Sequence, residues 1–97
     1  MKIVNEANGK GSEYWTVMIY INGKAIEDCC KIIGQLAEFI STKNEDIELA
    51  GCPTVYEFQN TKENEYSDSF SVNSDWYSKS EFIKEFRQLV KEFKKSK

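Results

Sequence analysis

Histidine is absent from this sequence of 97 residues, and proline, arginine and long apolar runs are scarce. Without histidine the chain lacks the usual general base, the Ser/His and Cys/His nucleophile pairs and the commonest zinc ligand. No apolar run approaches the roughly 20 residues of a membrane span, and the polar N-terminus differs from the apolar region of a signal peptide. We therefore expect a cytoplasmic, non-enzymatic protein without a cofactor or a metal.

The three cysteines do not suggest a disulfide framework, because their number is odd and two of them, Cys29 and Cys30, are neighbours. Adjacent thiols also lack the spacing of a zinc site. We interpret Cys29 as a small buried apolar residue.

The composition predicts a single folded domain over residues 1–97. Hydrophobic residues make up 40% of the chain and aromatic residues 13%. A chain of this length buries roughly 65% of the surface that it exposes when unfolded, so it needs no metal or disulfide for stability.

The stretch from Tyr14 to Ile26 has the pattern of a β-hairpin. Alternate residues of its first half are apolar, as in a strand with one buried face: Trp15, Val17, Ile19 and Ile21. Asn22-Gly23 readily forms a two-residue type I′ turn. With that turn, Ile19 lies opposite Ile26, and the apolar face continues across both strands.

A helix is expected to follow this hairpin, with Asp28 as its N-cap and its end near Thr42. Its core side carries apolar residues at helical spacing: Cys29, Ile32, Ile33, Leu36, Phe39 and Ile40. A second side consists of small residues: Cys30, Gly34, Ala37 and Ser41. Because small side chains let another backbone approach closely, either the second helix packs on this stripe or the stripe mediates self-association.

A second pair of strands is predicted after the helix. One strand is expected from Thr54 to Gln59, and a further strand carries Tyr66, Phe70 and Val72 on its apolar face. The opposite face of that strand is expected to be wet, because it carries serines: Ser67, Ser69 and Ser71.

The last helix has the clearest start signal in the sequence. Ser78 and Glu81 match a capping box, and the flanking Tyr77 and Phe82 occupy the positions of a hydrophobic staple. A helix is therefore expected to begin near Lys79. Its apolar side docks on the core, with these residues: Phe82, Ile83, Phe86, Leu89, Val90 and Phe93.

The expected order is hairpin, helix, hairpin, helix. An antiparallel sheet built from two hairpins, with two helices on one face, forms an α+β two-layer sandwich. We predict this fold class.

Charge is strongly segregated along the chain. Residues 44–77 have a net charge of −7, and residues 78–97 have a net charge of +4. An acidic segment repels nucleic acid and attracts basic surfaces. Acids at alternate positions of a strand stand roughly 6.6 Å apart, close to the roughly 6.8 Å covered by two phosphate steps of DNA, so the segment suggests a nucleic-acid mimic. A solvated loop kept soluble by its charges is the alternative.

Our leading hypothesis is a small acidic inhibitor that blocks the basic, nucleic-acid-binding surface of another protein, for example a nuclease, as anti-defence and immunity proteins do. We expect no direct contact with nucleic acid or membranes. The residues expected to bind the partner are Asp46, Glu48, Glu63, Glu65 and Asp68, with Tyr56 and Tyr66 as aromatic anchors.

The alternative from another class is a homodimeric structural or accessory module that associates through the small stripe of the first helix. A small-molecule binder is a third possibility that no feature of the sequence favours. The basic residues of the last helix are expected to form a solvated face: Lys84, Arg87, Lys91, Lys94 and Lys95.

Overall fold

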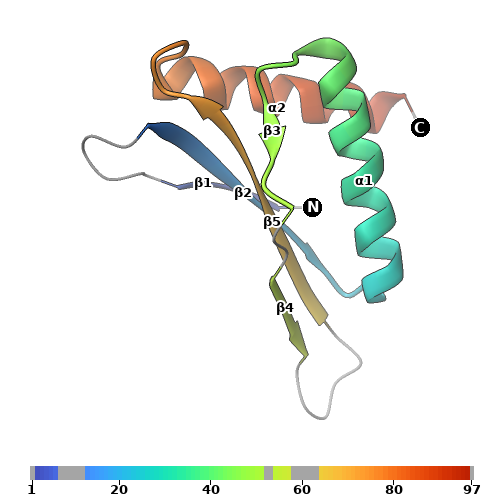
Figure 1. The fold of residues 1–97 in the computed structure, drawn as a ribbon. Coiled ribbons are helices and arrows are strands. Elements are labelled where there is room, and N and C mark those ends of the chain that lie inside the picture. The colour runs from blue at the N-terminus through green and yellow to red at the C-terminus, as the bar shows by residue number, and fades with distance from the viewer. Residues whose placement is uncertain (1, 7–12, 52–53, 58–63, 97) are drawn as a thin grey trace.

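A computed structural model describes residues 2–6, 13–51, 54–57 and 64–96 of the chain, and it shows an α+β fold (Figure 1). The elements in chain order are β1 (Lys2–Glu6), β2 (Tyr14–Asn22), α1 (Ile26–Lys43), β3 (Glu48–Leu49), β4 (Thr54–Glu57), β5 (Asn64–Asn73) and α2 (Lys79–Lys95). Within the described ranges, neither helix combines the length and the apolar character needed to cross a membrane.

The described strands form one antiparallel sheet in the order β1-β2-β5-β3, and β4 also pairs with β5. The long strands β2 and β5 occupy its centre. Along the other side of β5, β3 pairs at Phe70 and Ser71, whereas β4 pairs between Asn64 and Ser67. The two short strands therefore follow one another along the same edge (Figure 1).

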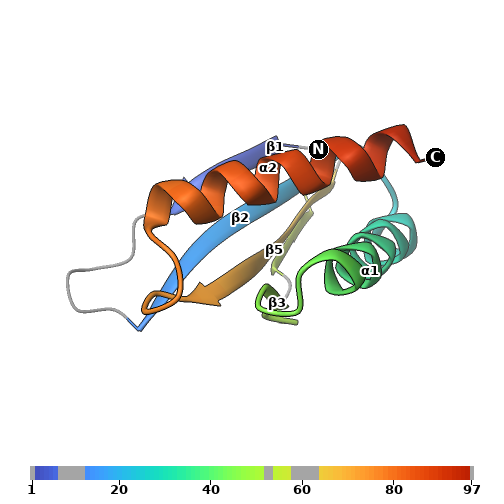
Figure 2. The ribbon, with the colours of Figure 1, turned by 90° about the horizontal axis from the view of Figure 1, so that it is seen from above.

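The core lies between the sheet and the two helices. Odd-numbered residues of β2 and even-numbered residues of β5 face this core, because the register pairs Val17 with Phe70 and Ile21 with Tyr66. α1 contacts β5 and β3, whereas α2 contacts β2 (Figure 2). The Phe70 and Phe86 rings, whose centroids are 5.1 Å apart, connect the sheet to α2.

The expected hairpin from Tyr14 to Ile26 is wrong in its second half. β2 is present, and Gly23 takes a positive φ of 72° as the turn prediction requires. After that turn, however, the chain enters α1 at Ile26 and forms no strand. Ile19 pairs with Ile3 of β1 and Asp68 of β5, and not with Ile26.

α1 also begins three residues before the predicted start, because Ala25 takes the place of Asp28 as the N-cap. Ala25 is its N-cap and makes no side-chain capping hydrogen bond, so Asp28 lies inside the first turn. The carboxylates of Glu27 and Asp28 still complement the positive end of the helix dipole there. The predicted core side of α1 is confirmed, because its apolar residues are buried or half-buried against the core: Cys29, Ile32, Ile33, Leu36, Phe39 and Ile40.

The small stripe of α1 does not receive the second helix. Cys30, Gly34 and Ser41 are exposed, and a Cβ atom at Gly34 would meet no atom within 4 Å. α2 meets α1 on another side, where the Phe39 and Phe93 ring centroids are 5.7 Å apart. Only Ala37 of the stripe is half-buried.

The start of α2 agrees with the sequence analysis. Ser78 is the N-cap: its Oγ accepts a hydrogen bond from the Glu81 amide at 3.2 Å and donates one to Glu81 Oε1 at 3.0 Å. Tyr77 and Phe82 both pack against the core.

The serine face of β5 is drier than predicted. Ser67 is buried, and Ser69 and Ser71 are half-buried, although all three lie on the face of β5 opposite Tyr66, Phe70 and Val72.

Candidate functional site

The structure separates the acidic residues that were expected to bind a partner. Asp46 and Glu48 are exposed, and Glu48 lies opposite Ser71 near the end of β5. Glu65 is half-buried near the start of β5. Six residues of strand between Glu65 and Ser71 span roughly 20 Å. These carboxylates therefore do not form one compact patch.

Asp68 and Tyr66 lie inside the protein. Each is only 3% exposed, on the face of β5 that the helices cover. Asp68 Oδ1 accepts a hydrogen bond from the Ser69 amide at 2.7 Å. A partner can reach neither side chain in this fold, which contradicts the expectation that Asp68 and Tyr66 bind a partner, whereas the predicted apolar face with Tyr66, Phe70 and Val72 is buried as expected. Glu63 and the side chain of Tyr56 lie outside the described residues.

The hydroxyl of Tyr66 lies beside Cys30, one of the two adjacent cysteines of α1. The thiol of Cys30 donates to the Tyr66 hydroxyl at 3.6 Å. Burial, followed by the contact with Cys30, raises the pKa of Tyr66 to about 12. Burial likewise raises the pKa of the Cys29 thiol, and the neighbouring Cys30 and Asp28 add to the effect. Cys29 is therefore a buried, protonated thiol, which agrees with the prediction of a small apolar residue.

The exposed carboxylates Asp46 and Glu48 line a small pocket that also holds two exposed aromatic side chains. Its lining consists of Tyr14, Asp46, Glu48, Trp76 and residues 71–73 of β5, and we call it the acidic aromatic pocket. Its volume is about 110 Å³. Tyr14 is 49% exposed and Trp76 is 62% exposed. No basic residue is among the described residues that line it.

The sheet register assembles this pocket from distant parts of the sequence. Tyr14 begins β2 opposite Asn73 of β5, and Glu48 of β3 lies opposite Ser71. Both positions belong to the sheet face opposite the buried residues Val17, Phe70 and Val72. Trp76 follows in the turn before α2, where its amide donates to the Asn73 carbonyl at 3.1 Å.

Tyr77 holds the rim of the acidic aromatic pocket in place. Its hydroxyl donates to Asp46 Oδ2 at 3.0 Å and accepts from Asn44 Nδ2 at 3.0 Å. Its carbonyl accepts from the Trp15 indole at 2.9 Å. The hydrogen bond from Asn44 lowers the pKa of Tyr77, but burial and the contact with Asp46 outweigh it and leave the pKa raised. The Asp46 carboxylate is thus fixed by a neutral donor.

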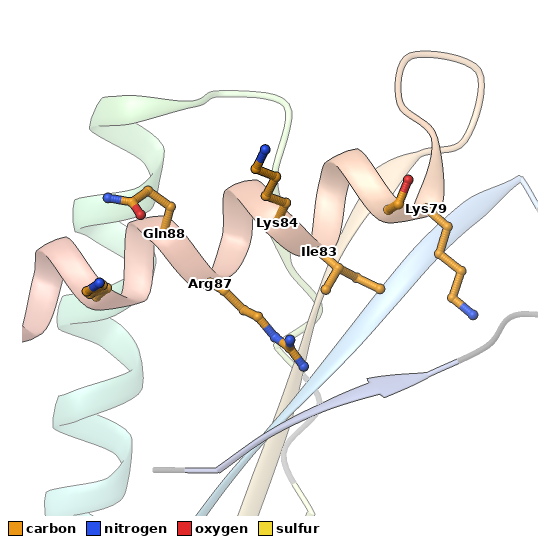
Figure 3. Close-up of a pocket in the computed structure, with 7 residues that line it drawn as sticks. Lys79, Ile83, Lys84, Arg87 and Gln88 are labelled. Carbon is orange, nitrogen blue, oxygen red and sulfur yellow. The ribbon is translucent and has the colours of Figure 1, made fainter.

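A second concave surface runs along α2, and we call it the basic groove (Figure 3). Its lining consists of Lys79, Ser80, Ile83, Lys84, Arg87, Gln88 and Lys91, and its volume is about 750 Å³. Figure 3 shows Lys79, Ile83 and Arg87 projecting from one side of α2, whereas Lys84 and Gln88 project from the other. The groove includes Lys84, Arg87 and Lys91 of the predicted basic face, but not Lys94 or Lys95.

The side chains of these two surfaces determine which kinds of ligand each one suits. In the described part of the chain, no three Cys, Asp or Glu side chains are placed to hold a metal ion. Two aromatic rings beside two carboxylates suit a cationic side chain, through cation–π attraction and charge pairing. A row of lysines and one arginine suits an anionic ligand.

Sequence reasoning found Asp46 and Glu48 but missed Tyr14 and Trp76. Trp76 stands in the polar turn NSDWYS just before the capping box, and an isolated tryptophan in such a turn was the signal available. Comparisons of the chain with protein-family models, with curated protein sequences and with solved structures found no match.

Proposed function

We propose that the chain is a small, non-enzymatic, intracellular inhibitor that binds the basic surface of another protein through the acidic aromatic pocket. The observation that carries the proposal is the exposure of Trp76 and Tyr14 beside the carboxylates of Asp46 and Glu48. Exposed aromatic side chains of this size are the usual anchors of protein interfaces. Carboxylates around such anchors select basic partners and speed their association.

The partner that this chemistry fits is a protein with a lysine- or arginine-rich surface, such as a nuclease or another nucleic-acid-binding enzyme. The net charge of −7 over residues 44–77 supports this choice. Because Asp68 and Tyr66 are buried, the proposed contact is confined to the surface around Asp46 and Glu48. It does not include a long row of carboxylates that would resemble the phosphates of DNA. Such an inhibitor would act as anti-defence or immunity proteins do, by covering the partner's basic site.

The proposal includes a two-layer arrangement of the domain. Both helices pack on one face of the sheet, so that the other face, which carries Tyr14 and Glu48, remains free for the partner. The hydrogen bonds of Tyr77 support it, because they hold the pocket rim in one conformation before binding and so reduce the entropic cost of association.

The test uses the protein as bait in a nuclease-treated lysate, followed by measurement of the affinity for each recovered basic protein. Asp46→Lys/Glu48→Lys reverses two pocket charges, and Trp76→Ala removes the exposed indole. The matched control is Glu27→Lys/Glu38→Lys, which makes the same charge change on the exposed surface of α1. We expect both pocket variants to weaken binding at least about tenfold and the control to bind normally.

Salt and enzyme assays complete this test. Binding should weaken at high salt, because exposed charges are screened over roughly 8 Å at physiological ionic strength. The recovered enzyme should lose its nucleic-acid activity when the protein is added. A partner that binds the pocket variants as well as the native chain would refute the proposal.

Self-association through α1 remains the second candidate, because the small stripe is uncovered. Nothing lies within 4 Å of a Cβ atom added at Gly34, so the backbone of a second copy has access there. In that case Gly34→Leu should convert dimers to monomers, and the pocket variants should leave the oligomeric state unchanged. A native protein that sediments as a monomer would exclude this candidate.

A further inference from the structure

The basic groove concentrates positive charge on one side of the protein. Three lysines line it, Lys79, Lys84 and Lys91, and within the described ranges none of their side chains forms a hydrogen bond or an ion pair, whereas the fourth cation, Arg87, has an interaction partner. No carboxylate is among its described lining residues. An anionic ligand would thus gain attraction from the three lysine side chains without displacing a partner from them.

The floor of the groove is apolar, which narrows the class of anion. Ile83 is its one aliphatic lining residue, and Figure 3 shows Ile83 on the same side of α2 as Lys79 and Arg87, whose aliphatic stems add apolar surface. No aromatic ring is among the described lining residues, so nucleobases would find no stacking platform. The groove suits a ligand with an apolar anchor flanked by carboxylates.

The same chain exposes a surface with these properties. Trp76 is a large exposed anchor, and Asp46 and Glu48 lie beside it in the acidic aromatic pocket. We infer that the basic groove binds the acidic aromatic pocket of a second copy of this chain. The indole of Trp76 packs over Ile83, and the carboxylates pair with the groove lysines. This inference shares one surface with the proposed function, but it does not depend on it.

The positions of the two surfaces determine the kind of assembly. Tyr14 and Glu48 occupy the uncovered sheet face, because their register partners in β5, Asn73 and Ser71, alternate with the core residue Val72. α2 packs against the other face. The contact is therefore head-to-tail, and it leads to short chains or a closed ring. It also covers the acidic aromatic pocket, so self-association competes with partner binding.

The test is sedimentation velocity on the native protein over a wide range of concentrations at low and high salt. We expect association that strengthens with concentration and weakens with salt. Lys79→Glu/Lys84→Glu/Lys91→Glu reverses the net charge of the groove, in which only Arg87 then remains positive, and Asp46→Lys/Glu48→Lys reverses the pocket. Each variant alone should associate at least about tenfold more weakly than the native chain. The matched control Lys31→Glu/Lys94→Glu/Lys95→Glu, at exposed positions outside the groove, should associate normally.

Mixing the two reversed variants provides the decisive measurement. One variant then carries two acidic surfaces and the other carries two basic surfaces, so hetero-association should return although each variant alone is monomeric. Thermal unfolding of both variants checks that they are folded. The mixing experiment requires no external partner, so its outcome is separate from that of the proposed inhibitor function.

Several results would overturn the inference. They are a native protein that stays monomeric throughout, an association that survives reversal of the groove, and folded variants that fail to associate when mixed. Loss of association in Gly34→Leu alone would move the contact to α1. Salt-dependent binding of a fluorescent oligonucleotide by a monomeric protein, abolished by Lys79→Glu/Lys84→Glu/Lys91→Glu, would assign the groove to a phosphate polymer instead.

Discussion

The buried hydroxyl of Tyr66 should make the stability of this protein fall at alkaline pH. Tyr66 is 3% exposed, and its pKa in the folded protein is about 12, whereas an unperturbed tyrosine ionises near 10. The folded state therefore holds this proton more tightly than the unfolded state does. The contribution is fully present below pH 10 and is lost as the pH rises from about 10 to about 12.

The magnitude follows from the size of the pKa difference. Each unit corresponds to about 1.36 kcal/mol, so two units remove about 2 to 3 kcal/mol from the free energy of unfolding. The raised pKa values of Cys29 and Tyr77 act in the same direction, because the folded state also retains those protons longer. A comparison with Tyr66→Phe is therefore needed to isolate the contribution of Tyr66.

The assay is urea unfolding of the native protein and of Tyr66→Phe between pH 8 and the highest pH at which both still fold, with reductant present. Tyr66→Phe should lie within about 1.5 kcal/mol of the native protein at pH 8, because it loses one weak hydrogen bond. It should then lose less stability than the native protein as the pH rises above 10. Tyr20→Phe, on the opposite sheet face, is the control and should follow the native curve. Equal losses in the native protein and Tyr66→Phe would refute the reasoning.

Four further changes test the packing and the backbone, each measured by urea unfolding at neutral pH. Phe86→Ala should lower the free energy of unfolding by about 3 to 5 kcal/mol, because Phe86 is fully buried and contacts Phe70 and Phe82. Gly23→Ala should cost about 1 to 2 kcal/mol, because its φ of 72° strains a residue with a Cβ. Gly34→Ala should instead stabilise α1 by up to about 1 kcal/mol, because the space around it is open. Ser78→Ala should cost about 1 kcal/mol through loss of the N-cap of α2.

The element types were largely predictable because hydrophobic period and capping signals are local. The apolar residues of β2, α1, β5 and α2 repeat at the spacing of their elements, and each of these segments has the predicted type. The predicted first hairpin failed because Asn22-Gly23 specifies a turn but not the type of the next element. Ile26 fitted both a strand opposite Ile19 and the first position of a helix, and the helix formed. β1 supplies the strand partner of β2 instead.

The burial of Asp68 could have been predicted from the sequence, because residues of a strand alternate between its two faces. Tyr66, Phe70 and Val72 were placed on the core face of β5, and position 68 lies between them on the same face. The charge of Asp68 suggested a solvent-exposed position. The side on which a residue lies is determined, however, by the alternation of side chains between the two faces of a strand. The backbone amide of Ser69 compensates part of the cost by donating to the carboxylate.

The candidate site, in contrast, could not be predicted from local sequence patterns, because it forms only where distant segments pair. Tyr14, Glu48 and Trp76 meet only because β5 pairs with β2 on one side and with β3 on the other, and no local pattern specifies the register of β3. Charge counting along the sequence grouped Glu48 with Glu65, whereas the fold places them near opposite ends of β5. In the proposed function, the net charge of the segment therefore predicts the sign of the partner's charge but not the surface that the partner contacts. The proposed surface is the one with the two exposed aromatic rings, because a carboxylate is stable in water at any surface position, whereas a largely exposed indole leaves apolar area that a partner can bury.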